Sequence, residues 1–294
     1  MRRSEFKKKQ QKRKLIIWGS IVLAVLVFFG AAYAFSTRPE EDCCMPDPGS
    51  NITQNNQAAA DEKPQVESVD VQPIIDQFVS RSSVDYGIEV YDVAAGKVIG
   101  SHQPDKQYFT ASIYKLYVAY LSLQRMQSGE FTDTPSYLGE RSRMGCIAYT
   151  IETSDSPCGE KLMGDITQSA MGKELQAFGL QNSPFPGFKT TAHDANIMLH
   201  KILEQKELNA DSTAYLKKAM NTQVYRNGLP KGFSEAQVYD KVGFNEDINF
   251  HDVGIVEFAN GRTYLVSIFT EGQGSSRPHR ELAALLQPEL LKVN

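Results

Sequence analysis

The sequence contains few of the residues that mark metal and nucleotide enzymes. Only four cysteines and five histidines occur among its 294 residues. It has neither a His-Glu-x-x-His nor a Cys-x-x-Cys pattern, which are common arrangements of zinc ligands. A Gly-x-Ser-x-Gly elbow and a glycine-rich phosphate loop are also missing, which argues against α/β-hydrolases and P-loop enzymes. We therefore expect no metal centre and no cofactor.

The chain also lacks a large excess of charge of either sign. It holds 31 basic and 35 acidic residues, for a formal net charge of −4. A domain whose main partner is nucleic acid usually has a basic excess, so we expect no nucleic-acid partner. The basic residues are unevenly placed, however, because eight of them lie in residues 1–14, beside one acid.

One long uncharged hydrophobic run follows this basic tail. Residues 15–35 are long enough to cross a bilayer as a helix. The cations before the run predict a cytoplasmic tail over residues 1–14, a single-pass transmembrane helix, and a C-terminal part outside the cell membrane. The segment Ala32-Tyr33-Ala34 resembles a signal-peptidase site, so a protein secreted after cleavage near Ala34 is the alternative. The length of the run and its strongly basic lead favour the anchor.

The rest of the chain divides into a linker and one domain. Residues 36–65 are rich in Pro, Asp, Glu, Asn and Gln and have almost nothing apolar to bury, which predicts a disordered linker. Residues 66–294 are long enough for one domain with a sizeable core. The sequence does not indicate an oligomeric state.

The cysteines fit an oxidising compartment. Cys146 and Cys158 flank a short segment, and a disulfide between them would close a small loop. Two buried free thiols are the alternative. Cys43 and Cys44 follow the hydrophobic run closely, and either a cross-link between two chains or no role at all fits their position.

The order of the expected elements indicates an antiparallel sheet interrupted by helices. Alternating apolar residues predict strands at 86–93, 98–99, 236–243, 251–259 and 262–270. Helical periodicity and capping residues predict helices at 73–80, from 112 onward, and at 144–150, 159–169, 191–203, 211–222 and 279–291, with a helical turn at 173–178. Parallel βαβ units would alternate regularly, whereas here the strands come first and last. We therefore predict an α/β (α+β) fold in which the two ends of the domain share one antiparallel sheet.

The functional interpretation starts from the Ser-Ile-Tyr-Lys sequence at 112–115. A helix that begins at Ser112 places Ser112 and Lys115 one turn apart on the same face. A lysine of lowered pKa can take the serine proton and so create a nucleophile. The helix N-terminus also favours a developing negative charge. The pattern is not specific alone, since Ser-Glu-Phe-Lys at 4–7 matches it equally well.

Two further short motifs follow in the expected domain. Ser154-Asp155-Ser156 lies in an expected loop, 42 residues after Ser112, and Lys241-Val242-Gly243 lies in an expected strand 87 residues later. Together the three motifs resemble the Ser-x-x-Lys, Ser-Asp-Asn and Lys-Thr-Gly set of class A β-lactamases and penicillin-binding proteins, in the same order. The resemblance extends over essentially all of residues 66–294. It implies a five-stranded antiparallel sheet flanked by helices, with an all-helical lobe and the site between them.

The resemblance also implies a role for each matching residue. Ser112 would be the acylated nucleophile, and Lys115 would accept its proton. Ser154 would relay a proton to the leaving nitrogen. Lys241 would hold a substrate carboxylate and lower the pKa of Lys115 through its like charge.

The same resemblance implies a set of substrate-binding positions. The backbone N–H groups of Ser112 and Phe244 would form an oxyanion hole. Ser156, Val242 and Gly243 would line the substrate site beside Lys241.

Three departures from the family motifs affect the expected chemistry. Ser156 stands where Asn is usual, and Val242 replaces the usual Thr or Ser, so a side-chain amide and a hydroxyl are missing. Residues 175–193 contain no Asp or Glu, although class A β-lactamases carry a glutamate in this loop that activates the deacylating water. We therefore expect an acyl-enzyme that forms and then hydrolyses slowly.

Other polar residues are expected to be structural. We predict that Arg226 pairs with Asp240 beneath the site, because a nearly buried charge needs a partner. Asp155 is expected to hold its loop through backbone hydrogen bonds. His193, His200 and His251 lack metal-ligand spacing.

These features predict a membrane-anchored, extracytoplasmic serine hydrolase. Its expected partner is a small-molecule β-lactam or the peptidoglycan-like peptide that a β-lactam mimics, and its chemistry is either β-lactam hydrolysis or slow acylation. A penicillin-binding D-Ala-D-Ala peptidase is an alternative. A catalytically impaired binding or sensor domain on the same scaffold is another, because the second and third motifs are both altered.

Overall fold

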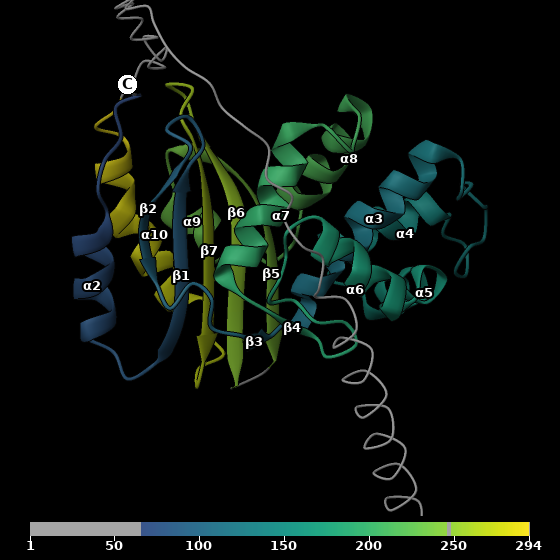
Figure 1. Cartoon of the computed structure of the whole chain (residues 1–294), viewed down its shortest axis with the longest axis horizontal. Coiled ribbons are helices and arrows are strands. Elements are labelled where there is room, and N and C mark those ends of the chain that lie inside the picture. The colour runs from purple at the N-terminus through teal and green to yellow at the C-terminus, as the bar shows by residue number, and fades with distance from the viewer. Residues whose placement is uncertain (1–65, 246–247, 294) are drawn as a thin grey trace, which may run out of the picture. The chain divides into compact units, whose positions relative to one another are not determined.

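The computed structural model describes residues 66–245 and 248–293. They form a five-stranded sheet with helices on both of its faces (Figure 1). The predicted cytoplasmic tail, transmembrane helix and linker all lie outside the described residues, as do Cys43 and Cys44. Within the described ranges, no helix has the length and apolar character needed to cross a bilayer.

The sheet joins the two ends of the domain, as the element order predicted. Its strand order is β2-β1-β7-β6-β5, and every neighbouring pair is antiparallel. The hairpin near the start of the domain therefore pairs directly with the last strand, and β5 lies at an edge. The bounds are β1 Asp85–Asp92, β2 Lys97–His102, β5 Ala236–Asn245, β6 Asn249–Phe258 and β7 Thr263–Glu271.

Three helices cover one face of the sheet and bury an apolar layer against it (Figure 1). They are α2 (Gln72–Ser80), α9 (Leu229–Gly232) and α10 (Arg277–Leu290). Ile75, Phe233 and Leu286 are fully buried between these helices and the strands. Burying such side chains stabilises the domain by about 1.5–3 kcal/mol each.

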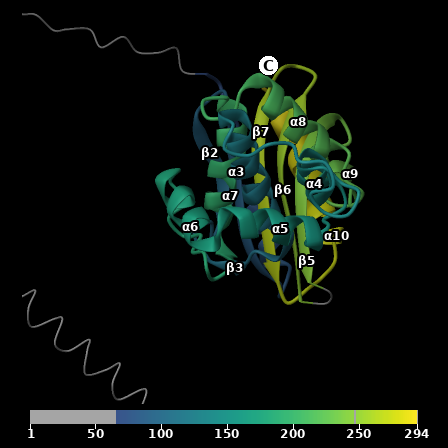
Figure 2. The same cartoon turned by 90° about the vertical axis from the view of Figure 1, so that its right-hand side faces the viewer.

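The remaining helices form a lobe on the opposite face, seen in front of the sheet in Figure 2. α3 is its central element, because every residue from Tyr114 to Leu123 is buried. α7 packs on β1, β6 and β7 and joins the lobe to the sheet. The bounds are α3 Tyr114–Ser128, α4 Arg143–Glu152, α5 Ser156–Ile166, α6 Gln168–Ala177, α7 Ala192–Glu204 and α8 Ala210–Asn221.

The region from 156 to 177 differs from the prediction. Instead of one helix at 159–169 and a turn at 173–178, the chain forms two helices that are interrupted at Thr167. Thr167 has a φ of 69°, and its hydroxyl accepts a hydrogen bond from the N–H of Ala170, which starts α6. No glycine or proline marks this break, so the local signals for a helix end were missing.

Three short elements were also not predicted. Strands β3 (Tyr108–Phe109) and β4 (Lys189–Thr190) pair with each other, and a 3-10 turn, η1 (Ala111–Ile113), precedes α3. α9 is only four residues long. Strands of two residues have no measurable periodicity, because the pattern needs several residues to repeat.

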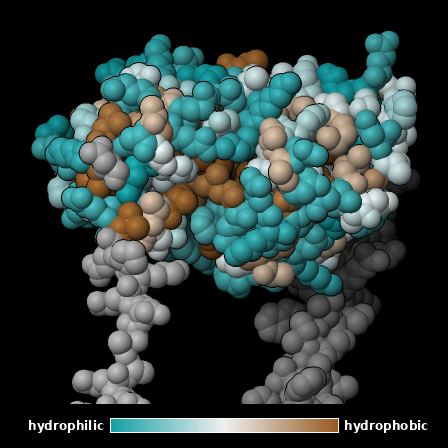
Figure 3. Space-filling model, turned by 90° about the horizontal axis from the view of Figure 1, so that it is seen from above, coloured by the Kyte–Doolittle hydropathy of each residue, from teal (hydrophilic) through white to brown (hydrophobic). Residues whose placement is uncertain are grey.

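Large hydrophobic side chains reach the surface in separate places. In Figure 3, the visible face of the molecule is mostly hydrophilic, with several distinct hydrophobic patches. Two of the exposed hydrophobic residues, Val224 and Tyr225, are adjacent in the chain. The others in the described part are Val66, Val98, Phe109, Ile248 and Leu285.

The predicted disulfide is confirmed. Cys146 of α4 is bonded to Cys158 of α5, and both residues are buried. The bond ties together the two helices that flank the Ser154 loop.

Removing this bond is expected to destabilise the domain. In the chain-entropy model, a cross-link over a separation of 12 residues is worth about 3 kcal/mol. A Cys146→Ala/Cys158→Ala variant should therefore lose about 3 kcal/mol of unfolding free energy in urea titrations. Adding reductant to the double variant tests any part played by Cys43 and Cys44 and should cause no further loss. An unchanged urea midpoint in the double variant would contradict the expected role of the bond.

Candidate active site

Ser112 lies in η1, at the entrance to α3. The residue before it, Ala111, has a φ of 44°, which is unusual for a residue with a Cβ. Such a backbone costs on the order of 1–3 kcal/mol and tends to occur at active sites. The strain at Ala111 therefore points to the Ser112 region independently of the sequence motif.

Lys115 points from the first turn of α3 back to Ser112. Its Nζ donates to Ser112 Oγ at 3.0 Å, to Ser156 Oγ at 3.0 Å and to the carbonyl oxygen of Ser154 at 2.5 Å. The side chain is almost fully buried, with 1% of the residue exposed. Lys115 thus has no carboxylate partner and is held by three neutral oxygens.

Ser154 connects the two lysines of the three motifs. Lys241 Nζ donates to Ser154 Oγ at 3.0 Å. It also donates to the carbonyl oxygen of Val242, the residue that follows Lys241, at 2.7 Å. Ser154 has a φ of 59°, and it offers its carbonyl to Lys115 and its hydroxyl to Lys241. The structure therefore brings Ser112, Lys115, Ser154 and Lys241 into one connected set.

Both lysines lie in surroundings that favour the neutral amine. Burial lowers the pKa of Lys115 to about 8, against smaller opposing effects of Asp155 and Glu160. Burial, and then the charge of Lys115, lowers the pKa of Lys241 to about 7. The predicted like-charge effect therefore acts on Lys241, whereas burial is the main cause at Lys115. Either amine can exchange a proton near neutral pH, which an exposed lysine cannot readily do.

Gly243 brings β5 close to the backbone of Ser112. A Cβ on Gly243 would lie 2.8 Å from the nitrogen of Ser112 and 2.9 Å from both the nitrogen of Ile113 and the carbonyl oxygen of Thr110. Only glycine permits this approach. Two N–H donors from η1 and from the end of β5 can point at one substrate oxygen only if the two backbones come together in this way.

Two predicted substrate-binding residues are placed differently. The Val242 side chain is fully buried, because alternation along β5 directs it to the sheet face opposite Lys241. It is therefore not available to a ligand, and only its carbonyl takes part, through Lys241. Ser156 is exposed, but its hydroxyl accepts a hydrogen bond from Lys115, so it also positions that amine.

The two expected structural residues behave as predicted. Asp155 caps α5, because its Oδ1 accepts a hydrogen bond from the N–H of Cys158 at 2.8 Å. Arg226 pairs with the buried Asp240, with 3.0 Å between Nη1 and Oδ1. The ion pair lies under β5, on the face opposite Lys241.

The loop that lacks acidic residues contributes aromatic rings instead. Phe185 packs on Phe188, and Phe188 packs on Tyr114, with ring centroids 5.4 and 5.3 Å apart. Tyr114 directly precedes Lys115, so these rings lie next to the first turn of α3. The nearest carboxylate after this loop, Asp194, accepts hydrogen bonds from Asn182 and Ser183 and is 1% exposed. Within the described residues, no group of His, Cys, Asp and Glu side chains could hold a metal ion.

The sequence analysis did not identify the aromatic residues next to Phe244. Tyr225 and Phe250 both pack on its ring, at centroid distances of 5.1 and 6.0 Å. They come from a loop and from β6, and no motif links them in the sequence. The β5–β6 register, which opposes Phe244 to Phe250, would have been the only available signal.

Comparisons with known proteins agree with this geometry. Residues 144–287 match the model of the Beta-lactamase enzyme family. Among solved structures, PBP-A is similar with a TM-score of 0.68 at 18% identity, over 77% of this chain and 99% of that one. A mutant of PBP-A, solved as an acyl-enzyme complex with penicillin G, is similar with a TM-score of 0.68 at 19% identity, over 76% and 97% of the two chains.

A further match is a β-lactamase from Xanthomonas campestris pv. campestris. Its TM-score is 0.67 at 19% identity, and the match covers 76% of this chain and 99% of that one. No curated protein matches the sequence. The family match over residues 144–287 and the shared fold support a relationship to the β-lactamase-like serine hydrolase superfamily.

Proposed function

We propose that this protein forms an acyl-enzyme at Ser112 with β-lactams or related peptidyl substrates. One observation carries the proposal, namely the connected set in which Lys115 contacts Ser112 and Lys241 contacts Ser154. A serine next to a buried lysine without a carboxylate partner is an activated nucleophile. The penicillin G complex reported for the PBP-A mutant supports the choice of β-lactams as probes.

The proposed reaction follows from these contacts. Neutral Lys115 takes the proton of Ser112 as Oγ attacks the carbonyl carbon, and the N–H groups of Ser112 and Phe244 stabilise the oxyanion. The C–N bond then breaks, and Ser154 gives its hydroxyl proton to the leaving nitrogen. Lys241 returns a proton to Ser154, so one lysine gains a proton and the other loses one.

The acyl-enzyme is proposed to be long-lived. Hydrolysis of the ester needs a base that activates water on the side of the loop before β4, and residues 175–193 supply no carboxylate. Phe185 and Phe188 occupy part of this loop and exclude water from their contacts. The proposed activity is therefore of the penicillin-binding type, with slow turnover.

The proposed location is the outer face of the cell membrane. The basic residues at 1–14 and the uncharged run at 15–35 support a single-pass anchor with the domain outside. Secretion after cleavage near Ala34 is the other arrangement that the sequence permits. The N-terminal sequence of the mature protein, isolated from membranes, distinguishes the two.

The proposed function is tested with the full-length chain in detergent. The protein is mixed with a chromogenic cephalosporin and, separately, with benzylpenicillin, and both colour and intact mass are followed over time. We expect a colour burst of about one equivalent, then slow turnover, and a mass increase equal to one penicillin. Sustained fast turnover would identify an efficient β-lactamase. The absence of both burst and adduct in a folded sample would favour a binding or sensor domain.

The acylation rate is expected to pass through an optimum between pH 7 and pH 8. The rate rises at low pH because the competent form of Lys115 is neutral and its pKa is about 8. It falls at high pH because Lys241, whose pKa is about 7, must keep the proton that it returns to Ser154. Both limbs of the profile belong to the two interacting lysines. Stopped-flow or quenched mass measurements check this profile, and a rate of adduct formation that does not change between about pH 5 and about pH 10 would contradict the roles of the two lysines.

A further inference from the structure

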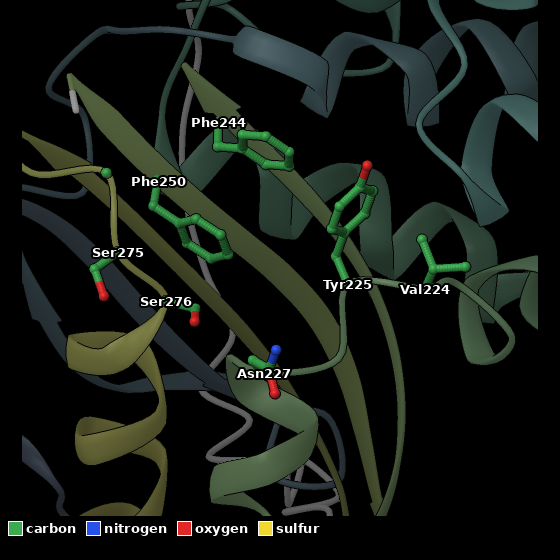
Figure 4. Close-up of a pocket in the computed structure, with 8 residues that line it drawn as sticks. Val224, Tyr225, Asn227, Phe244, Phe250, Ser275 and Ser276 are labelled. Carbon is green, nitrogen blue, oxygen red and sulfur yellow. The ribbon is translucent and has the colours of Figure 1, made fainter. Parts of the chain in front are cut away.

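A pocket of about 530 Å³ lies beside the end of β5 (Figure 4). Its walls include three aromatic rings, and Figure 4 shows Phe244, Phe250 and Tyr225 around one opening. Phe244 stacks on Phe250 and meets Tyr225 edge-on. The remaining lining residues are small or neutral polar ones, namely Val224, Asn227, Gly274, Ser275 and Ser276.

The pocket shares one residue, Phe244, with the candidate active site. The N–H of Phe244 is a proposed oxyanion donor, and its ring is a wall of the pocket. Alternation along β5 directs this ring to the face opposite the one that Gly243 presents to Ser112. Because β5 is the edge strand, a substrate held at Phe244 N–H can place one substituent around that edge and into the pocket.

The loop that carries Tyr225 also borders the site. The N–H of Val224 donates to the carbonyl of Glu152 at the end of α4, two residues before Ser154. Arg226, the next residue, turns inward to Asp240 and is not part of the pocket wall. The segment therefore contributes Val224 and Tyr225 to the pocket wall, whereas its cation is paired with Asp240.

The pocket is poorly suited to a carboxylate. None of its lining residues carries a charge. A helix N-terminus can bind anions through free N–H groups, and α10 begins at the pocket. However, the N–H of Arg277 is taken by Ser275 Oγ, and Pro278 has no N–H to offer. The Arg277 side chain is mostly exposed and pairs with Glu281.

We propose that this pocket binds an uncharged aromatic group of the substrate, attached on the side of the leaving nitrogen, where a penicillin carries its carboxylate. Three rings offer edge-on and stacked contacts to such a group, and the hydroxyls of Ser275 and Ser276 can hydrogen-bond to a neutral polar atom on it. A carboxylate at the same place would lose its hydration without gaining a cation from the pocket wall. This inference rests on the proposed function, because it places the substrate relative to Ser112.

The test compares benzylpenicillin with its methyl and benzyl esters, in which the carboxylate is replaced by a small neutral and a neutral aromatic group. Binding is measured by calorimetry on the full-length Ser112→Ala protein, so that it does not depend on acylation. We expect the benzyl ester to bind at least about tenfold more tightly than the acid, with the methyl ester in between. Tyr225→Ala, added to Ser112→Ala, should reduce this preference to less than about threefold. Tyr225→Phe should keep it.

Leu285→Ala provides a control, because Leu285 is another exposed hydrophobic residue and lies outside the pocket. It should leave the ester preference unchanged. Equal or tighter binding of the acid would overturn the proposal, as would an ester preference that survives Tyr225→Ala. If the wild-type protein forms no adduct but the ester preference is found, the acyl-enzyme proposal fails while the aromatic pocket stands.

Discussion

Ser112→Ala is expected to abolish covalent binding of penicillins and to lower any turnover of a chromogenic cephalosporin by at least about 10³-fold. The substitution removes the hydroxyl that the proposed mechanism uses for attack, which Lys115 Nζ contacts at 3.0 Å. Its effect on folding should be small, because Ser112 lies in a short turn and its hydroxyl has only this one contact in the described structure. Intact mass and initial rates check both parts of the prediction.

Ser128→Ala is the matched control for this substitution. Ser128 is an exposed serine at the far end of α3, and its hydroxyl donates only to the carbonyl of Arg125. It should acylate at the parent rate. An adduct that forms equally well on Ser112→Ala would mean that another nucleophile reacts and would remove the basis of the proposed mechanism.

Gly243→Ala is the second substitution with a large expected effect. The added Cβ would meet three backbone atoms, of Thr110, Ser112 and Ile113, at 2.8–2.9 Å. Backbone cannot move aside as a flexible side chain can, so β5 and η1 must separate. We expect a loss of about 1–3 kcal/mol of unfolding free energy and a loss of about 10²-fold or more in acylation rate, since the two oxyanion donors are pulled apart.

Gly164→Ala is the matched control for this loss. Gly164 lies in the exposed part of α5, and nothing lies within 4 Å of the position its Cβ would take. The substitution should leave acylation unchanged and stabilise the domain by about 0.5–1 kcal/mol, because alanine favours a helix. If Gly243→Ala acylates as fast as Gly164→Ala, the close approach of β5 to Ser112 is not needed for the chemistry.

The sequence was sufficient to predict the sheet and the four central residues. Long strands such as β6 and β7 alternate clearly, and their position at the end of the domain predicted pairing with the first hairpin. Ser112, Lys115, Ser154 and Lys241 were found because each belongs to a short motif of fixed spacing. The structure adds the contacts between them, including the link from Ser154 to both lysines.

The features that were missed depend on tertiary contacts. The break at Thr167 has no glycine or proline signal, and β3 and β4 are too short to show a period. The burial of Val242 follows from which face of β5 is covered, which the motif alone does not state. Tyr225, Phe244 and Phe250 meet only in the folded chain, so the aromatic pocket could not be read from any one segment.

The electrostatic prediction was right in direction and incomplete in cause. Two ammonium groups near each other were expected to lower the pKa of Lys115. In the structure, burial is the main cause of the lowered pKa of both lysines. The like-charge effect is that of Lys115, which lowers the pKa of Lys241. Burial of a lysine depends on how completely the surrounding helices and strands close over it, and sequence spacing does not give that information.

The most direct test of the account is to locate the acyl group. The full-length protein is treated with benzylpenicillin, freed of excess ligand, and followed by intact mass and by peptide mapping over several hours. The account predicts one penicillin per chain, attached to the peptide that carries Ser112, and lost only slowly. An unmodified protein, or a modification mapped to a different residue, would contradict it.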